Sequence, residues 1–569
     1  METRLKLEPL RGYGHQFIYK AIGFTARELS LPRIAIINSW SEQSPGHSHL
    51  RAVADGVKAG VRMAGGMPFE INVPGLCSVP GRGTEDMAYD LPQREAVVSA
   101  IEASLHVSYC DGWVGIASCD KIVPAMLMAA LRLNRPFIFL GGGQMLPAEC
   151  EGQRAGFQVG QAIAREQIRE LGPGPAAEQA ARQIIDRVTD CCATSAGACP
   201  EFTTGNSMAA LTEGLGLALP GSSTSPGVAA EKIWDAKATG EKIVELAVKE
   251  IKPRDIFTLN ALKNAIAVDM AIAGGTNAVV HLQACAHEAG IPCTLDTWDE
   301  ISRKVPAICS VYPSGDYTLY DYHKAGGTPA VMKRIRQFLD ESCLTVTGRT
   351  LGENLAEVAL HESAVIRSLD RPVWKEGAVA VLRGNLAPRG AVTRHTVVEN
   401  KDLLQKTYSA RVFDTVHAAT EGVAAGKVKP GDILVCRYQG PRGGPAMTEC
   451  LGLVGALKNY QVKNVAVLTD GRFSGWTQGY LAIGHACPEA QMGGNLCLLQ
   501  DDDRIKVDIP ARQLNVELTE EELQARRKKW TPPVQAGVTG VLLIYSSLAL
   551  QADQGAGWPV RSTDLNVKY

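Results

Sequence analysis

The chain has 569 residues, of which 45% are hydrophobic and 21% charged, an ordinary composition for a soluble globular protein. At roughly 100–200 residues per domain, this length allows two to four domains. The 58 Lys and Arg residues nearly balance the 60 Asp and Glu residues, and the net charge of −2 does not support a nucleic-acid-binding protein. No apolar run approaches the roughly 18 residues needed to span a membrane, and residues 1–6 lack the apolar core of a signal peptide.

The 15 cysteines are too few and too irregularly spaced for a disulfide scaffold. Because no export signal is recognisable, we expect a cytoplasmic protein with reduced thiols. Most of these thiols are expected to be small buried hydrophobic groups, and a few could bind a metal or a cluster.

Four short apolar runs in the first 150 residues are typical of buried strands, and helix-like segments separate them. The runs are 33–37 (RIAII), 68–73 (PFEINV), 113–117 (WVGIA) and 136–140 (PFIFL), and the helix-like segments are 48–64, 93–105 and 124–133. This alternation predicts an α/β domain, in which helices cover the faces of a mostly parallel sheet.

Chemically active side chains follow these predicted strands. His47, Cys77 and the run Cys119-Asp120-Lys121 stand in three of the loops. In parallel sheets, ligands bind outside the carboxyl ends of the strands, where such loops meet. Packing would explain each residue alone, but the set favours a functional site.

The Cys119-Asp120-Lys121 run offers several kinds of chemistry. The Cys119 thiolate could bind iron or another soft metal, and the Asp120 carboxylate suits a hard cation. Lys121 could act as a base, or could react with CO₂ to form a carbamate whose oxygen binds a metal. Taken alone, this short run is a weak motif.

The middle third of the sequence is rich in predicted helices, and the part after it is rich in predicted strands. Segments 229–250 and 259–287 are helix-like, the second with a glycine break at 274–277. After about residue 377 the strand-like segments are 378–382, 433–438, 465–469, 505–509 and 514–518. We therefore predict an α/β domain over 1–372 and a β-rich, barrel-like domain over 373–569 that completes the active site.

Three further groups could carry chemistry. Cys199 ends a loop of small residues and could reach a cluster shared with Cys119. The backbone N–H groups of Gly443 and Gly444 could contact an anionic substrate, and Glu449 could bind a metal. Ser474 lies between glycine-containing turns, but no His partner marks a hydrolase triad. A buried thiol and ordinary turns are the alternative explanations.

Several long motifs make the chain resemble the family of dihydroxy-acid and sugar-acid (phosphogluconate, aldonate) dehydratases. They include CDKIVPAMLMAALRLNRP from Cys119, GACPEFTTGNSMAALTEGLGLALPG from Gly197, QGPRGGPAMTE from Gln439 and LTDGRFSG from Leu468. The resemblance covers nearly the whole chain. It implies an α/β domain that holds an Fe–S cluster of the 2Fe-2S type and Mg²⁺, capped by a β-barrel, in a homodimer or homotetramer.

The resemblance also implies a reaction and a set of roles. The family removes water from a 2,3-dihydroxy acid and forms a 2-keto acid, in amino-acid biosynthesis or sugar-acid catabolism. The matching positions are Cys119 and Cys199 as cluster ligands; Asp120, a carbamylated Lys121 and Glu449 as Mg²⁺ ligands; and Ser474 as the base.

Two positions depart from the family pattern. A cluster cysteine is expected after Pro45, where this chain has Gly46, and an acidic Mg²⁺ ligand is expected at Ser78. Cys77 is new and could replace the missing thiolate, as could the His47 imidazole. Cys77, Cys119 and Cys199 are therefore predicted to converge on one metal site.

Three interpretations remain open at this stage. The protein is an active dehydratase with altered cluster ligation, or a cluster-free enzyme that catalyses another elimination or an isomerisation of a hydroxy acid, or a catalytically silent relative that binds a hydroxy acid or a partner. The sequence leaves open whether the substrate is a branched-chain dihydroxy acid or a sugar acid.

Overall fold

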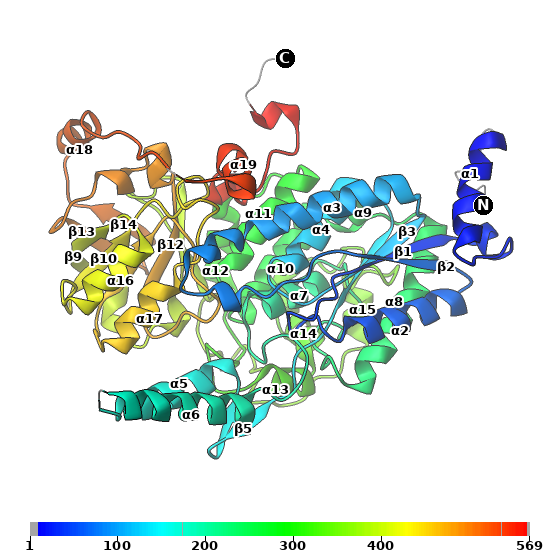
Figure 1. Cartoon of the computed structure of the whole chain (residues 1–569), viewed down its shortest axis with the longest axis horizontal. Helices are drawn as coiled ribbons and strands as arrows, with labels where there is room; N and C mark the ends of the chain where they lie inside the picture. The colour runs from blue at the N-terminus through cyan, green and yellow to red at the C-terminus, as the bar shows by residue number, and fades with distance from the viewer. Residues whose placement is uncertain (1–8, 173, 536, 566–569) are drawn as a thin grey trace.

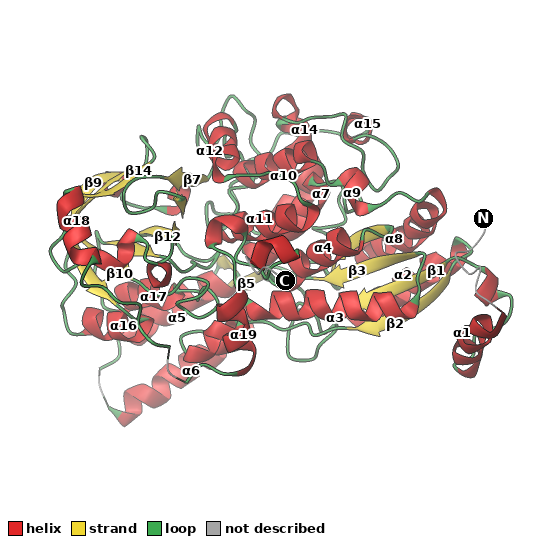
Figure 2. Cartoon of the chain, turned by 90° about the horizontal axis from the view of Figure 1, so that it is seen from above, coloured by secondary structure: helices red, strands yellow, loops and turns green. Residues whose placement is uncertain are grey.

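The computed structural model describes residues 9–172, 174–535 and 537–565. A parallel sheet and a larger β-rich sheet lie at opposite ends of the molecule, and most of the helices lie between them (Figures 1 and 2). Helix α1 (Pro9–Ala21) projects from the end that holds the parallel sheet (Figure 1). Residues 1–6, for which the sequence predicted no signal peptide, lie outside the described residues.

The parallel sheet has four strands in the order β2-β1-β3-β4. Its strands are β1 (Arg33–Asn38), β2 (Met67–Asn72), β3 (Gly112–Ala117) and β4 (Phe137–Gly141), and the intervening helices are α2 (Leu50–Met63), α3 (Pro92–Ser108) and α4 (Ile122–Leu133). All three strand pairs are parallel, which confirms the predicted α/β fold. The sequence therefore located every strand of this sheet.

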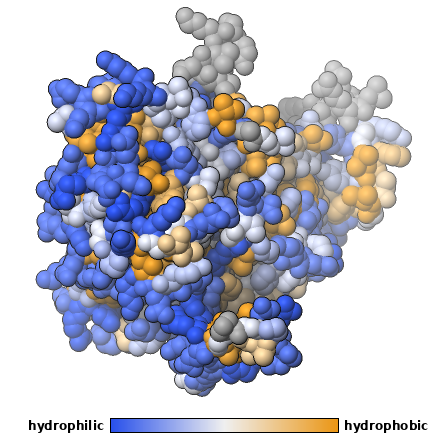
Figure 3. Space-filling view, turned by 60° about the vertical axis from the view of Figure 1, so that its left-hand side comes forward, coloured by the Kyte–Doolittle hydropathy of each residue, from blue (hydrophilic) through white to orange (hydrophobic). Residues whose placement is uncertain are grey.

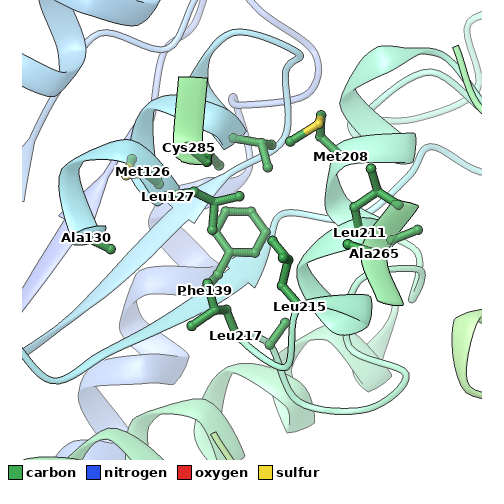
Figure 4. Packing of buried hydrophobic residues seen from close by; sticks show 14 of the residues in the cluster. Met126, Leu127, Ala130, Phe139, Met208, Leu211, Leu215, Leu217, Ala265 and Cys285 are labelled. Carbon is green, nitrogen blue, oxygen red and sulfur yellow. The ribbon is translucent and has the colours of Figure 1, made fainter. Parts of the chain in front are cut away.

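The core of the α/β part is apolar and closely packed. In Figure 4, the Phe139 ring of β4 lies among Leu127 of α4 and Leu215 and Leu217, which follow α7 (Thr204–Gly214). None of these four side chains exposes more than 1% of its surface. Burial of such large apolar groups fixes the sheet against the helices and thereby the positions of the loops at the sheet edge.

Helices from the middle of the chain surround this core. They are α8 (Ala230–Lys249), α9 (Pro253–Ile256), α10 (Leu259–Ala271), α11 (Asn277–Ala289), α12 (Leu295–Lys304), α13 (Leu319–Lys324), α14 (Gly327–Arg334) and α15 (Leu351–Ala356). The expected glycine break separates α10 from α11. Helices α5 (Phe157–Arg169) and α6 (Pro175–Cys192) pack beside a small hairpin of β5 (Ala148–Cys150) and β6 (Gln153–Ala155), as Figure 1 shows.

The C-terminal part is an eight-stranded sheet in the order β14-β13-β9-β10-β11-β12-β8-β7. Its strands are β7 (Val379–Leu382), β8 (Gly390–Arg394), β9 (Gln405–Phe413), β10 (Asp432–Cys436), β11 (Ala466–Thr469), β12 (Leu481–Cys487), β13 (Arg504–Asp508) and β14 (Gln513–Val516). Its helices are α16 (Val416–Ala424), α17 (Leu451–Asn459), α18 (Glu520–Arg527) and α19 (Gly540–Leu548). Arg383, next to β7, bridges to Gln513 in β14, so the two edges of the sheet meet. This nearly closed sheet confirms the predicted barrel-like domain.

The sequence missed β8, β9 and β12, and the domain boundary at 372–373 stays a prediction. None of the helices within the described residues is both long and apolar enough to cross a membrane. On the face shown in Figure 3, hydrophilic side chains cover most of the surface and orange apolar patches are interspersed.

Helices α2 and α8 approach each other closely through glycines. A Cβ atom added at Gly60 of α2 would lie 2.0 Å from the Lys237 carbonyl oxygen of α8, and one added at Gly240 would lie 2.2 Å from the Val57 carbonyl oxygen. Backbone atoms cannot move aside as the end of a flexible side chain can. These glycines are therefore required by packing.

We expect Gly60→Ala to lower the melting temperature, because the added methyl group forces α2 away from α8 at a cost of about 1–3 kcal/mol. Circular dichroism during heating measures this change. Gly14→Ala in α1 is the matched control, since no atom lies within 4 Å of its added Cβ. Equal melting temperatures for Gly60→Ala and the unmodified protein would contradict the close packing of these helices.

Candidate functional site

A cavity of about 80 Å³ lies at the carboxyl edge of the parallel sheet. Loops after β2 and β3, the start of α7 and two loops of the C-terminal part form its walls. The lining includes Cys77, Ser78, Arg82, Cys119, Asp120, Cys199, Thr203, Thr204, Glu449, Ser474 and Trp476. The turn before α4 and the first residues of α7 contribute to this lining, and the positive end of a helix dipole favours negative charge nearby.

Cys119, Asp120 and Lys121 form the turn between β3 and α4. The Cys119 carbonyl accepts hydrogen bonds from the N–H groups of Ile122 and Val123. Lys121 is the N-cap of the helix and exposes only 2% of its surface. The strand-to-helix turn thus holds all three side chains at the sheet edge, as the sequence predicted.

His47 hydrogen-bonds to this turn and holds it in place. Its Nε2 accepts a hydrogen bond from the Cys119 N–H at 3.1 Å, and its Nδ1 contacts the Ser39 carbonyl oxygen at 2.7 Å. Burial lowers the pKa of His47 to about 4, so the ring is neutral at pH 7. Because both ring nitrogens have protein partners, the structure does not support the hypothesis that His47 replaces the missing cysteine.

Gly46 lies directly beside the Cys119 thiol. A Cβ atom added at Gly46 would lie 3.2 Å from Cys119 Sγ and 3.3 Å from Ser118 Cβ. The Ser44 hydroxyl is also close to Cys119 Sγ, at 3.5 Å. Position 46 therefore faces the thiols, although in this chain it carries no side chain.

Cys77 and Cys199 line the same cavity as Cys119. The side-chain amide of Gln43 hydrogen-bonds the backbone N–H and C=O of Cys77 and so fixes its loop. The neighbouring Cys119 thiol, together with burial, raises the pKa of Cys77 above its usual value. Burial also raises the pKa of Cys199, and the charges of Glu201 and Cys77 add to this effect. Cys77 thus faces the cavity and its thiols.

These side chains are not arranged as a complete set of ligands for one metal ion. Among the described residues, no three His, Cys, Asp or Glu side chains are close enough together to hold one metal ion. The three thiols share a cavity, and their predicted convergence on one metal stays a prediction.

The Lys121 ammonium group lies among carboxylates. Its Nζ is 2.6 Å from Asp120 Oδ2 and 2.9 Å from Asp90 Oδ2. Burial lowers the pKa of Lys121, but Asp120 and Asp90 outweigh it and hold this pKa above its usual value. Lys121 is therefore a fully charged buried cation in this structure.

Asp90 joins three parts of the site. Its carboxylate accepts hydrogen bonds from the Ser78 hydroxyl and, at 2.6 Å, from Arg472. Burial raises the pKa of Asp90, but Lys121 and Arg472 lower it to about 2. Ser78, where the family resemblance placed an acid, is thus in contact with a carboxylate that comes from position 90.

Glu449 completes the acidic group from the C-terminal part. Its carboxylate is 3.5 Å from Arg472 and is almost fully buried. Burial raises the pKa of Glu449, while Lys121 and Arg472 oppose that rise. The structure therefore brings Asp120, Lys121 and Glu449 together, and their predicted role as Mg²⁺ ligands stays a prediction.

Ser474 lines the cavity on a loop that follows β11. Its hydroxyl accepts a hydrogen bond from the Trp476 N–H at 3.3 Å. The buried Arg394 guanidinium donates to the carbonyl oxygens of Gly475 and Thr477 and holds the loop in place. A Cβ atom added at Gly475 would lie 2.9 Å from Thr203 Cα, so the loop packs directly against the start of α7.

Gly443 and Gly444 are not among the residues that line the cavity. The Gly443 N–H donates to the Glu489 carboxylate at 2.9 Å, and the Gly444 N–H donates to the Gly440 carbonyl at 2.9 Å. Both N–H groups therefore already have acceptors within the protein, and the structure does not bring them to the cavity.

Sequence reasoning missed Asp90, Arg82, Arg394 and Arg472 as parts of this region. Arg472 stands inside the quoted LTDGRFSG motif, so the motif contained a signal for it. Asp90 and Arg82 lie in irregular segments around two short 3₁₀ turns, Val79–Gly81 and Glu85–Tyr89, whose paths no periodic pattern reveals.

The fold and the cavity define an enzyme site in which thiols, carboxylates and a buried lysine of an α/β domain meet a serine and a glutamate of a barrel-like domain. The family description "Dihydroxy-acid/6-phosphogluconate dehydratase" matches this chain in its N-terminal form over residues 31–354 and in its C-terminal form over residues 364–556. The chain therefore belongs to this dehydratase family.

Individual relatives agree with this assignment. The chain is 42% identical over 545 residues to a dihydroxy-acid dehydratase of Pyrococcus abyssi. The aligned residues make up 95% of this chain and 97% of the relative. The chain is 43% identical over 545 residues, with the same coverage, to a dihydroxy-acid dehydratase of Acetivibrio thermocellus. The similarity therefore includes both parts of the fold.

We expect Gly46→Cys to form a disulfide with Cys119 in air-exposed protein, because the distance from its Cβ to Cys119 Sγ already suits one. Intact-mass measurement and thiol counting detect the loss of two free thiols. Gly46→Ser, which adds a side chain of similar size, is the control and should lose none. Two unreacted thiols at these positions after mild oxidation would show that position 46 does not face Cys119.

Proposed function

We propose that this protein is a hydro-lyase that converts a 2,3-dihydroxy acid into a 2-keto acid, with a 2Fe-2S cluster and Mg²⁺ as cofactors. The observation that carries the proposal is the Lys121 ammonium, which lies 2.6 Å and 2.9 Å from two carboxylates at the edge of a cavity that also holds Cys119 and Ser474. The dehydratase names of the relatives support the reaction class.

The acidic group fits a divalent cation. With all five groups ionised, Asp90, Asp120 and Glu449 carry −3 and Lys121 and Arg472 carry +2, which leaves 2 − 3 = −1. A carbamate on Lys121 would replace its positive charge by a negative one and leave −3. Oxygen ligands and excess negative charge are what Mg²⁺ requires, and Asp120, Glu449 and the Lys121 carbamate would hold it.

The thiols fit an iron–sulfur cluster by their chemistry. Cys119 and Cys199 would hold it, and Cys77 would supply the thiolate that Gly46 lacks. The support for Cys77 is that it contacts the same cavity and interacts with the Cys119 thiol. When bound, the cluster would act as a Lewis acid toward the C3 hydroxyl, and Mg²⁺ would stabilise the developing enolate.

Among the residues of the chain, Ser474 carries out the proton transfer. Ser474, as an alkoxide, removes the Cα proton, and the C3–O bond breaks with loss of the hydroxyl group. The Cα proton and the departing hydroxide together make one water molecule. The remaining enol moves its hydroxyl proton to C3 and becomes the 2-keto acid.

Anaerobic purification followed by iron and acid-labile sulfide analysis tests the cluster. A panel of branched-chain dihydroxy acids and aldonic acids, with detection of 2-keto acids, tests the reaction and selects the substrate class. Turnover without iron or sulfide would contradict the cluster, and no turnover with any acid would contradict the dehydratase function. On the family resemblance we also propose that the protein is cytoplasmic and forms a homodimer or homotetramer. Sedimentation of the purified protein tests the oligomeric state.

We expect Lys121→Ala to abolish turnover, because the carbamate oxygen is lost. Lys121→Arg is the matched variant: it keeps a positive charge among the carboxylates but cannot form the carbamate. Inactivity of both variants, with melting of Lys121→Arg near that of the unmodified protein, supports the carbamate. Full activity of Lys121→Arg would show that only the charge matters.

We expect Ser474→Ala to lower kcat by about 10²–10⁴-fold with little change in KM, the pattern of a lost proton-transfer group. Steady-state kinetics measure both constants. Ser108→Ala in α3, which also removes a single hydrogen-bonded hydroxyl, is the control. An unchanged kcat with a raised KM would instead make Ser474 a binding residue.

A further inference from the structure

Arg82 stands between the two short 3₁₀ turns that follow β2, and its side chain lines the cavity. The cavity also contains Asp120, Glu449 and Ser474. No motif in the sequence assigned a role to Arg82, and none of the proposed steps uses it. Its position nevertheless puts a guanidinium group beside the proposed reaction site.

Two aromatic rings hold this guanidinium. Its central carbon lies 5.0 Å from the centre of the Trp476 ring and 5.7 Å from the centre of the Phe157 ring. The two rings stack on each other with centroids 4.2 Å apart and planes 7° apart. Guanidinium groups bind to aromatic faces in this way without using their N–H donors.

The aromatic contact also links Arg82 to the proposed base. The backbone N–H of Trp476 donates to the Ser474 hydroxyl, and the backbone carbonyl oxygen of Trp476 accepts a hydrogen bond from the Gln158 side chain at 2.7 Å. The ring that supports the guanidinium is therefore fixed two residues from Ser474. A group bound to Arg82 would be placed relative to that hydroxyl.

The donors of Arg82 are available, unlike those of Lys121 and Arg472. These two cations both contact the Asp90 carboxylate. Within the part of the chain that the structure describes, the Arg82 side chain makes no hydrogen bond and no ion pair. Burial lowers the pKa of Arg82, and the charge of Glu449 opposes this change.

Other charged groups lie near Arg82. Arg165 and Lys458 are close enough for their charges to act on Arg82 or to be affected by it, and Glu399 is the acid near Lys458. Glu449, which also lines the cavity, is close enough to Arg82 to oppose the lowering of its pKa by burial. The two neighbouring cations favour an anion beside Arg82.

We propose that Arg82 binds the carboxylate of the substrate. The inference rests on the proposed function, which supplies a substrate of the 2,3-dihydroxy acid class. A planar guanidinium presents two parallel N–H groups to the two oxygens of a carboxylate. The stacked rings of Trp476 and Phe157 keep this fork in place, and the hydroxyl-bearing carbons then lie toward Ser474 and the acidic group.

Binding of unreactive ligands tests this role. The probes are 2-hydroxy-3-methylbutanoate, which has no C3 hydroxyl to lose, and its amide, which has no charge; 3-deoxygluconate, which also lacks the C3 hydroxyl, and its amide form a second pair. Isothermal titration measures the binding of each probe to the full-length protein. We expect the unmodified protein to prefer the acids, and Arg82→Gln to weaken acid binding at least tenfold while amide binding changes less than twofold.

Two variants control the measurement. Arg82→Lys keeps the charge without the planar fork and should fall between Gln and Arg. Arg51→Gln removes another guanidinium that lies over a tryptophan, 3.5 Å from the centre of the Trp40 ring and outside the cavity lining, and should bind the acids normally.

The other outcomes are decisive too. Unchanged acid binding by Arg82→Gln would overturn the inference, as would an equal loss of acid and amide binding, which would mean that Arg82 only supports Trp476. No preference of the unmodified protein for either acid would also overturn it. If Arg82-dependent acid binding is found but no dihydroxy acid is turned over, the carboxylate site stands and the proposed reaction fails.

Discussion

The buried ammonium of Lys121 is the interaction on which the site depends. It is shared by Asp120, its neighbour in the chain, and Asp90, which also binds Arg472 from the C-terminal part. Removal of one member would leave an uncompensated charge in a buried setting, which typically costs about 3–5 kcal/mol. The charges thus join the α/β part to the barrel-like part, and the sheet edge and the Glu449 loop are held together by the same groups that form the acidic wall of the cavity.

The sequence predicted the parallel sheet well because its strands are short, apolar and buried. It missed β9 because exposed polar side chains such as Lys406 conceal a strand pattern, and it missed β8 and β12, for which no strand-like run was recognised. In the site, the motifs identified Cys119, Asp120, Lys121, Cys199, Glu449 and Ser474, all of which lie in or beside the cavity. Asp90 and Arg82 were missed because irregular segments bring them there, and tertiary contacts rather than local patterns set such paths.

The two departures from the family pattern are explained differently by the structure. At Ser78 the hydroxyl contacts the Asp90 carboxylate, so negative charge is still present beside Lys121. At Gly46 the neighbouring His47 imidazole does not take the missing place, since it is already bonded to Ser39 and Cys119. Cys77 is the thiol that the next loop brings to the same cavity, because neighbouring parallel strands lie about 4.8 Å apart and end at a common edge. The acid has a replacement in contact with Ser78, whereas the candidate for the missing thiolate, Cys77, lies in the same cavity as Cys119 and Cys199.

The cavity holds both carboxylates and a cation, and these charges bear on the choice of substrate. Asp120 and Glu449 are the carboxylates, and the guanidinium of Arg82, which lies near Arg165 and Lys458, is the cation. A 2,3-dihydroxy acid has an anion at C1 and neutral hydroxyl groups at C2 and C3. Binding of the C1 carboxylate to Arg82 would be the same for branched-chain and sugar acids. Selection between them must then come from the rest of the molecule. Met87 and Leu451 add apolar surface to the cavity lining, and such surface favours a hydrocarbon side chain over further hydroxyl groups.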